Sequence, residues 1–209
     1  LIPRGKSAYQ WMVEHLVGTE ELIYALVDFP ETVRSLWEVM VAKDLEAVRM
    51  AVESDYDYFI TWEDASTQNY SPAQYDTYIG SEIGTWCRLL DEAGKRYIQH
   101  ACGHVANLVK RMKDHGAFAV ESISPPPTGN ITIREARRIT GGDFGIIGGI
   151  EPTQFLTLSE DALGPYVESV IAEAEGGPFV LANSDSCPPG VTIDKFKRVA
   201  EIAKTHKPQ

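Results

Sequence analysis

The sequence is poor in positive charge and in long apolar runs. Its 209 residues include 19 lysines and arginines against 30 aspartates and glutamates, a formal net charge of -11 at pH 7. This balance leaves no basic surface for a phosphate backbone, so we expect no nucleic-acid partner. No apolar run reaches the roughly 20 residues that a membrane-spanning helix needs, so we expect no membrane partner either.

Cysteine is also scarce. The chain has three cysteines, Cys87, Cys102 and Cys187. An odd number of cysteines in a chain of this length is not typical of a disulfide framework and favours a reducing compartment, where thiolates serve as metal ligands or nucleophiles. We therefore expect a cytoplasmic protein. Cys87 lies among apolar residues of a helical stretch and is predicted to be a core residue, whereas the other two need separate attention.

The patterning of apolar residues predicts an α/β fold. Residues 30–54 carry apolar side chains at steps of three and four, which is typical of one face of a long helix. Short apolar runs then alternate five times with helical stretches. The runs are residues 58–62, 96–100, 117–123, 144–150 and 178–182, and the helical stretches are residues 81–93, 105–114, 131–140, 159–175 and 192–205. This alternation predicts βα units in a parallel sheet.

Polar side chains cluster directly after these predicted strands. Parallel α/β folds present functional side chains at the C-terminal ends of their strands, so these positions are the candidate site. The candidates are Glu63, Asp64, His100, Cys102, His104, Ser122, Ser124, Glu151, Asn183, Asp185 and Cys187. Glu63 and Asp64 are predicted to act as a general acid or base pair or to supply a metal ligand, or equally to hydrogen-bond loop amides.

His100, Cys102 and Cys187 form a candidate metal site. His100 and Cys102 are two residues apart on a strand leaving its sheet, so their side chains can point to the same side. If the sheet closes into a barrel, Cys187 faces the same mouth. Zinc favours such a mixed set of imidazole and thiolate ligands, and three protein ligands leave the fourth position open for catalysis. Alternatively, the same three residues are a buried histidine and two small buried cysteines of the core that bind no metal.

Three motifs in order resemble those of the uroporphyrinogen decarboxylase superfamily. They are His-Ala-Cys-Gly-His at 100–104, Gly-Gly-Ile-Glu-Pro at 148–152 and Ala-Asn-Ser-Asp-Ser-Cys-Pro-Pro-Gly at 182–190. The resemblance covers nearly the whole chain. It is strongest to the branch of corrinoid-dependent methyltransferases, the methylcobamide:coenzyme M methyltransferases and their relatives, in which a His-x-Cys pair and a later cysteine hold zinc.

The resemblance implies a (β/α)8 barrel of about 340 residues. Residues 1–209 would form a single domain of this type that covers the C-terminal five βα units, without the first three strands. An open fragment of a barrel exposes two sheet edges, so we expect either a piece of a longer protein or a homodimer that covers the edges.

The resemblance also implies a reaction. Zinc held by His100, Cys102 and Cys187 would activate a thiol or folate acceptor to take a methyl group from a corrinoid, a cobalamin carried by a partner protein. The small-molecule methyl acceptor is left open. Glu63 or Asp64 would complete the coordination sphere or act in catalysis. Glu151, Asn183 and Asp185, at the ends of the last two strands, are assigned to substrate binding.

Two alternatives stay open at this point. The first is decarboxylation of a tetrapyrrole, as in the decarboxylases of the superfamily, which carry a histidine after the last strand. Residues 183–187 read Asn-Ser-Asp-Ser-Cys and contain no histidine, which disfavours this reading. The second is a non-catalytic module that docks a corrinoid protein, which would keep zinc without transferring a methyl group.

Overall fold

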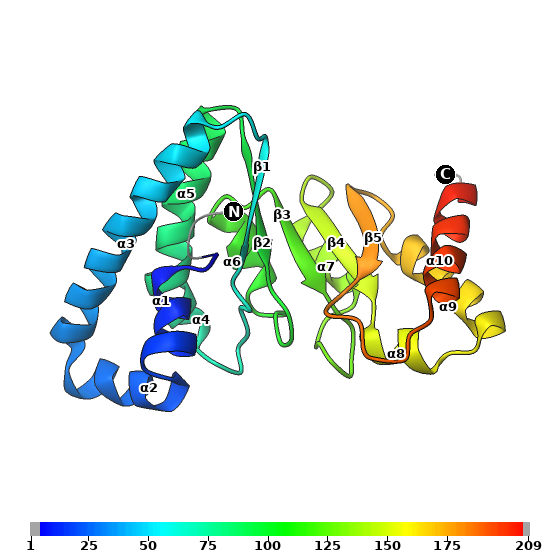
Figure 1. Ribbon diagram of the computed structural model, residues 1–209, viewed down its shortest axis with the longest axis horizontal. Helices are drawn as coiled ribbons and strands as arrows, with labels where there is room; N and C mark the ends of the chain where they lie inside the picture. Colours follow the sequence, from blue (N-terminus) through cyan, green and yellow to red (C-terminus); the bar gives the residue numbers. More distant parts are fainter. Residues whose placement is uncertain (1–4, 207–209) are drawn as a thin grey trace.

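The computed structural model describes residues 5–206, which contain one parallel sheet (Figure 1). Its strands are β1 Tyr58–Trp62, β2 Arg96–His100, β3 Ala119–Ile123, β4 Gly145–Ile150 and β5 Phe179–Asn183. They pair in sequence order, each parallel to the next. The five predicted strands are confirmed, with bounds that differ by at most two residues. Because consecutive strands are parallel and neighbouring, their C-terminal ends lie at one edge of the sheet.

Helices connect the strands and precede the first one. They are α1 Ala8–Trp11, η1 Met12–Leu16, α2 Thr19–Asp28, α3 Pro30–Glu53, α4 Pro72–Gln74, η2 Tyr75–Gly80, α5 Ser81–Glu92, α6 Val109–Asp114, α7 Ile133–Thr140, α8 Pro152–Thr157, α9 Glu160–Glu173 and α10 Ile193–Thr205. The two labelled η are π-helical. Within residues 5–206, no helix is both long enough and apolar enough to cross a membrane.

The long helix α3 packs along α5 at one end of the sheet (Figure 1). Pro30 occupies its first turn, where the missing N–H costs nothing. Val33, Met40 and Val48 are buried on the predicted apolar face. Trp37 Nε1 donates to the carbonyl of Tyr78 at 3.1 Å, which joins α3 to η2. The predicted helix over residues 30–54 is thus confirmed.

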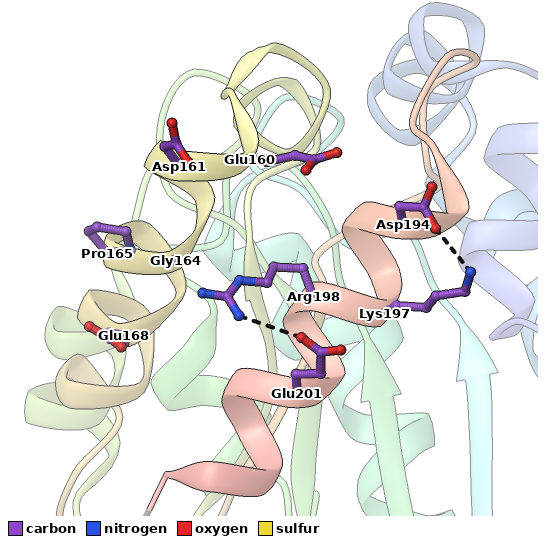
Figure 2. Close-up of a pocket in the computed structure, with 9 residues that line it drawn as sticks. All are labelled: Glu160, Asp161, Gly164, Pro165, Glu168, Asp194, Lys197, Arg198 and Glu201. Atoms are coloured by element: carbon purple, nitrogen blue, oxygen red, sulfur yellow. Dashed lines mark hydrogen bonds and ion pairs between the residues drawn. The ribbon is translucent and has the colours of Figure 1, made fainter.

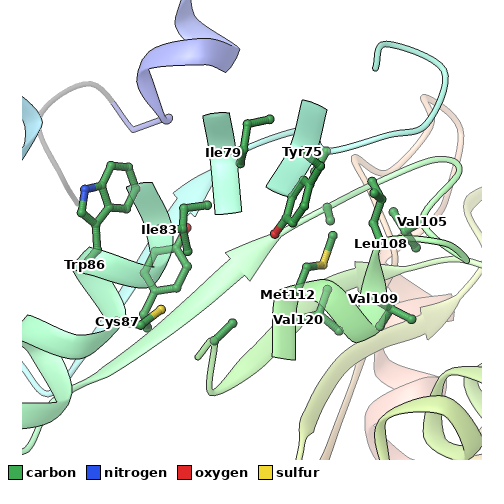
Figure 3. Packing of buried hydrophobic residues seen from close by; sticks show 14 of the residues in the cluster. Tyr75, Ile79, Ile83, Trp86, Cys87, Val105, Leu108, Val109, Met112 and Val120 are labelled. Atoms are coloured by element: carbon green, nitrogen blue, oxygen red, sulfur yellow. The ribbon is translucent and has the colours of Figure 1, made fainter. Parts of the chain in front are cut away.

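The main hydrophobic core lies between the helices and the first strands (Figure 3). Trp86 on α5 packs edge to face on Tyr97 of β2, and both are fully buried. Cys87 lies in this core as predicted, and burial raises the pKa of its thiol to about 12. A smaller core lies under α9 and α10 and includes Phe155 and Leu163. The main core reaches under β4 through Ile146, and the smaller core adds support at the C-terminal end of the chain.

The two faces of the sheet differ in their covering. Side chains alternate along each strand, so Phe59 and Thr61 point into the helical layer, whereas Tyr58 and Trp62 point to the other face. That other face is partly exposed: Tyr58 is 61% exposed, Trp62 45% and Val180 55%. Strands β1 and β5 form the two edges of this sheet. An arc of parallel strands with helices on its outside is the architecture of part of a barrel.

Candidate metal centre

Three metal-liking side chains meet at the C-terminal ends of β1 and β2. One ligand atom from each of Asp64, His100 and Cys102 lies within 4.8 Å of the others. His100 Nε2 is 3.2 Å from Asp64 Oδ1, and Cys102 Sγ lies 3.6 Å from the same oxygen. The structure thus brings together one imidazole, one thiol and one carboxylate.

The register of β1 on β2 explains why these groups meet. Trp62 is paired with His100, so the chain leaves both strands at the same level of the sheet. Asp64 then has a positive φ of 47°, a conformation that aspartate tolerates better than most residues, and the chain turns there. The turn brings the Asp64 carboxylate to His100. A non-glycine residue held in this region is frequent at functional sites.

Lys6 binds the second oxygen of the Asp64 carboxylate. Its ammonium group bonds to Asp64 Oδ2, to Glu14 Oε1 at 2.9 Å and to the carbonyl oxygen of Trp62 at 2.5 Å. Burial raises the pKa of Asp64, but the hydrogen bonds from His100 and Lys6 outweigh it and hold that pKa well below its usual range. Asp64 is therefore a carboxylate across the physiological range.

Glu121 contacts the second ring nitrogen of His100. The two residues are paired across β2 and β3, and Glu121 Oε2 is hydrogen-bonded to His100 Nδ1. Burial lowers the pKa of His100, but the hydrogen bonds to Asp64, Cys102 and Glu121 raise it to about 11. With Nδ1 engaged by Glu121, Nε2 points to Asp64. A carboxylate behind a ligating imidazole is the arrangement that orients histidine ligands on metals.

Glu121 is not among the residues predicted from the sequence. It lies inside an apolar run, and only residues after that run were considered. The signal was nevertheless present, because a glutamate in the middle of a buried parallel strand is unusual unless it is paired.

A cavity of about 400 Å³ opens beside these groups. It is lined by Trp62, Asp64, His100, Glu121, Ala182, Asn183, Asp185 and Ser186. Asn183 and Asp185, predicted to bind substrate, thus line the same cavity as two of the three clustered ligand groups. Their role in binding stays a prediction.

Two buried serines attach the loop after β5 to the end of β3. Ser122 has a φ of 83° at an irregularity in the pairing of β3 with β4, and its hydroxyl donates to the carbonyl of Ser184. The Ser184 hydroxyl donates to the Ile123 carbonyl at 2.5 Å and accepts from the Gly149 N–H at 2.7 Å. These bonds hold the loop that carries Asp185 beside the cavity.

Cys187 lies outside the cluster of three ligand atoms. It is half-buried and packs against the smaller core, and burial raises the pKa of its thiol. Its neighbour Ser186 lines the cavity, so the loop itself is at the site. Cys187 as a zinc ligand stays a prediction.

Glu63 points into the helical layer. Its carboxylate accepts hydrogen bonds from the N–H and the hydroxyl of Ser7, both at 2.7 Å, and from the Thr61 hydroxyl at 2.9 Å. Full burial raises the pKa of Glu63 to about 7 although these bonds lower it. The contact joins α1 to the sheet. Glu63 does not line the cavity, and its catalytic role stays a prediction.

Glu151 caps α8. Its Oε2 accepts from the Gln154 N–H at 2.7 Å and from the Thr153 hydroxyl. Burial raises its pKa, but these hydrogen bonds outweigh burial and lower it below the ordinary value. Glu151 also stays outside the residues that line the cavity, so its predicted contact with substrate remains a prediction.

A second, larger hollow lies between α9 and α10 (Figure 2), with a volume of about 580 Å³. Its lining is mostly charged, and Figure 2 shows Arg198 bonded to Glu201 and Lys197 bonded to Asp194. All of its residues come from these two helices on the outside of the sheet. Of the residues that the structure describes, none from a C-terminal strand end lines this hollow. We therefore assign the candidate site to the cavity of about 400 Å³ beside His100.

The model of the family described as uroporphyrinogen decarboxylase matches residues 11–206. The chain belongs to this family. The predicted superfamily is thereby confirmed. A search of curated proteins found no match.

Among solved structures, this chain is similar to a methyltransferase from Methanosarcina mazei. The TM-score is 0.77 at 14% sequence identity, and the match covers 95% of this chain and 56% of the methyltransferase. The chain thus spans little more than half the length of that structure. At this identity the likeness shows the fold, a (β/α) barrel of which the present chain covers five βα units, as predicted.

Proposed function

We propose that the chain carries the metal centre of a zinc-dependent methyltransferase, which moves a methyl group from a corrinoid on a partner protein to a small acceptor. The observation that carries this proposal is the meeting of Asp64, His100 and Cys102 at the C-terminal ends of adjacent parallel strands. The likeness to a methyltransferase fold supports it.

The cluster suits zinc. The donors are an imidazole nitrogen, a sulfur and a carboxylate oxygen, the three ligand types that zinc takes in proteins. A wholly carboxylate set would favour magnesium or calcium, whereas the thiol of Cys102 selects a softer ion. Glu121 on Nδ1 leaves Nε2 for the metal, which would displace its proton.

Each residue of the cluster has a separate role in the proposed reaction. His100, Cys102 and Asp64 hold the metal, and Glu121 keeps the His100 ring in place. When bound, zinc supplies a Lewis acid that lowers the pKa of an acceptor thiol. The acceptor sulfur would take the methyl group from the corrinoid substrate, whose cobalt would keep the electron pair of the broken cobalt–carbon bond, and the thiol proton would leave to water. Asn183 and Asp185 line the cavity that would receive the acceptor.

Tetrapyrrole decarboxylation is less well supported by the cavity. Such a substrate carries several carboxylates, which require positive side chains. No lysine or arginine lines the cavity in the described part of the chain, and Asp64, Glu121 and Asp185 would repel an anion.

The test is zinc content together with methyl transfer. Protein purified without added zinc would be analysed for metal as wild type, as Cys102→Ser and as Cys87→Ala, the last a thiol in the main core. We expect about one zinc per chain in wild type and Cys87→Ala, and loss of zinc in Cys102→Ser. Methyl transfer from methylcobalamin to thiols, followed by the cobalamin absorbance, should follow the zinc.

Wild-type protein that is folded by circular dichroism but free of stoichiometric zinc would overturn the proposal. Zinc retained without transfer of the methyl group from either free methylcobalamin or a methylated corrinoid protein would indicate a non-catalytic docking module instead.

A further inference from the structure

Carboxylates outnumber cationic side chains around the cavity at the candidate metal centre. Asp64, Glu121 and Asp185 line it, and no lysine or arginine does so among residues 5–206. Lys6 is close to Asp64, but its ammonium group is already bonded to Asp64, Glu14 and the Trp62 carbonyl. His100 also lines the cavity, but both of its ring nitrogens are already engaged by Asp64 and Glu121. An acceptor with a negative end group would therefore find no unpaired counter-charge among these residues.

Trp62 adds an aromatic wall. Its indole lines the cavity and is nearly half exposed. The ring is held in place, because it lies 5.1 Å from the His100 ring between centroids, and the backbone N–H donates to the Gly5 carbonyl at 2.6 Å. A positioned indole beside carboxylates is the combination that binds organic cations, since the ring face attracts positive charge.

Asp185 is the carboxylate left to pair with such a cation. Asp64 is engaged by His100 and Lys6, and Glu121 is engaged by His100. Among residues 5–206, the Asp185 carboxylate accepts only from the N–H of its neighbour Ser186, at 2.6 Å, and its side chain is exposed at the cavity. One carboxylate oxygen can therefore meet a ligand without losing a partner.

We propose that the methyl acceptor is a small thiol that carries an ammonium group, with Trp62 and Asp185 holding the ammonium end. This inference rests on the proposed function, because the thiol end is assigned to the metal centre. Both ends then fit the cavity: the sulfur goes to the side of His100 and Cys102, and the positive group goes to the side of the loop after β5. A sulfonate or carboxylate in place of the ammonium group is repelled.

The first experiment tests the cation subsite without zinc or catalysis. Binding of tetramethylammonium, and of methanesulfonate as the anionic counterpart, would be measured by ligand-observed NMR on metal-free protein. We expect saturable binding of the cation alone, weakened at least tenfold in Asp185→Asn and in Trp62→Leu, and kept in Trp62→Phe. Asp194→Asn, in the hollow between α9 and α10, is the matched control and should bind as wild type.

The second experiment compares three thiols with the same two-carbon spacing on zinc-loaded protein. They are 2-aminoethanethiol, 2-sulfanylethanol and 2-sulfanylethanesulfonate, with methylcobalamin as the donor. We expect kcat/KM for the aminothiol to exceed that for the sulfonate at least tenfold, with the difference in KM. Asp185→Asn should raise KM for the aminothiol about tenfold and leave the neutral thiol unchanged.

The outcomes separate this inference from the proposed function. Equal use of all three thiols, a preference for the sulfonate, or an equal effect of Asp185→Asn on all thiols would overturn the inference and leave the methyltransferase standing. Failure to methylate any thiol, with tetramethylammonium still bound through Trp62 and Asp185, would instead overturn the proposed function and with it the assignment of the cation as a methyl acceptor.

Discussion

The two halves of the sheet place polar residues at their strand ends in different ways. At the ends of β1 to β3, Asp64, His100 and Glu121 form one chain of hydrogen bonds that points away from the helical layer. At the ends of β4 and β5, the acidic group Glu151 caps a helix and Cys187 packs against the smaller core. Of the predicted site residues in that half, Asn183 and Asp185 line the cavity, beside their neighbours Ala182 and Ser186.

A polar residue that directly follows a strand therefore does not always belong to the candidate site. Parallel register aligns Trp62, His100 and Glu121 on one level, and their side chains share the face that the helices leave open. The loops after β4 and β5 lack such a row. There, Glu151 accepts from a backbone N–H and Cys187 packs against an apolar surface. The predictions below test whether metal binding belongs to the first half alone.

The largest effect is expected from Asp64→Asn, compared with Asp185→Asn. The first change removes a ligand charge while keeping a residue type that accepts a positive φ, so zinc affinity should fall roughly 100-fold. The second should leave zinc affinity unchanged, because Asp185 is outside the cluster of ligand atoms. Competition with a chromophoric chelator measures both. Equal losses would show that both halves hold the metal.

A smaller effect is expected from Glu121→Gln, compared with Glu151→Gln. The first removes the carboxylate on His100 Nδ1, which should lower zinc affinity by about 10-fold to 100-fold, with the fold retained. The second alters a helix cap and should leave zinc affinity as it is. The same chelator competition applies. Unchanged affinity in Glu121→Gln would refute its role in orienting the ring.

Cys187→Ser should weaken zinc binding less than tenfold, on the order of 1 kcal/mol or below, because Cys187 is outside the cluster of ligand atoms. Elemental analysis and chelator competition, run beside Cys102→Ser, measure this. A loss as large as that of Cys102→Ser would mean that the loop after β5 moves onto the metal, and it would support the ligand set implied by the sequence motifs.

The smallest effect concerns stability and pH. The folded pKa of Glu151 is below its ordinary value of 4.5, so its carboxylate stabilises the fold above that pH, and this contribution is lost as pH falls through the folded pKa. Glu151→Gln should cost about 1 kcal/mol or less at pH 7, which corresponds to about 2–4 °C in Tm, and less at pH 3. Thermal unfolding at both pH values measures it. A difference that grows on acidification would contradict the sign.

Much of the fold could be predicted from the sequence because local patterns determine it. Buried parallel strands read as short apolar runs, and the stretch from Pro30 to Glu53 carries the spacing of a helix face. The site was predicted less completely. Asp64, His100 and Cys102 were all among the candidates, but Glu63 could not be separated from Asp64, since adjacent residues point to opposite faces and the sequence does not tell which face the helices cover.

The order of strands and helices, the family and the residues from which a metal site could be built were all predictable from the amino-acid sequence. Only the tertiary structure decided which of those residues meet. Register across β1, β2 and β3 placed Glu121 behind His100, and the packing of the loop after β5 turned Cys187 to the smaller core. The physical reason is that contacts between strands depend on register and on competing burial, and neither is encoded in the spacing of residues along one strand.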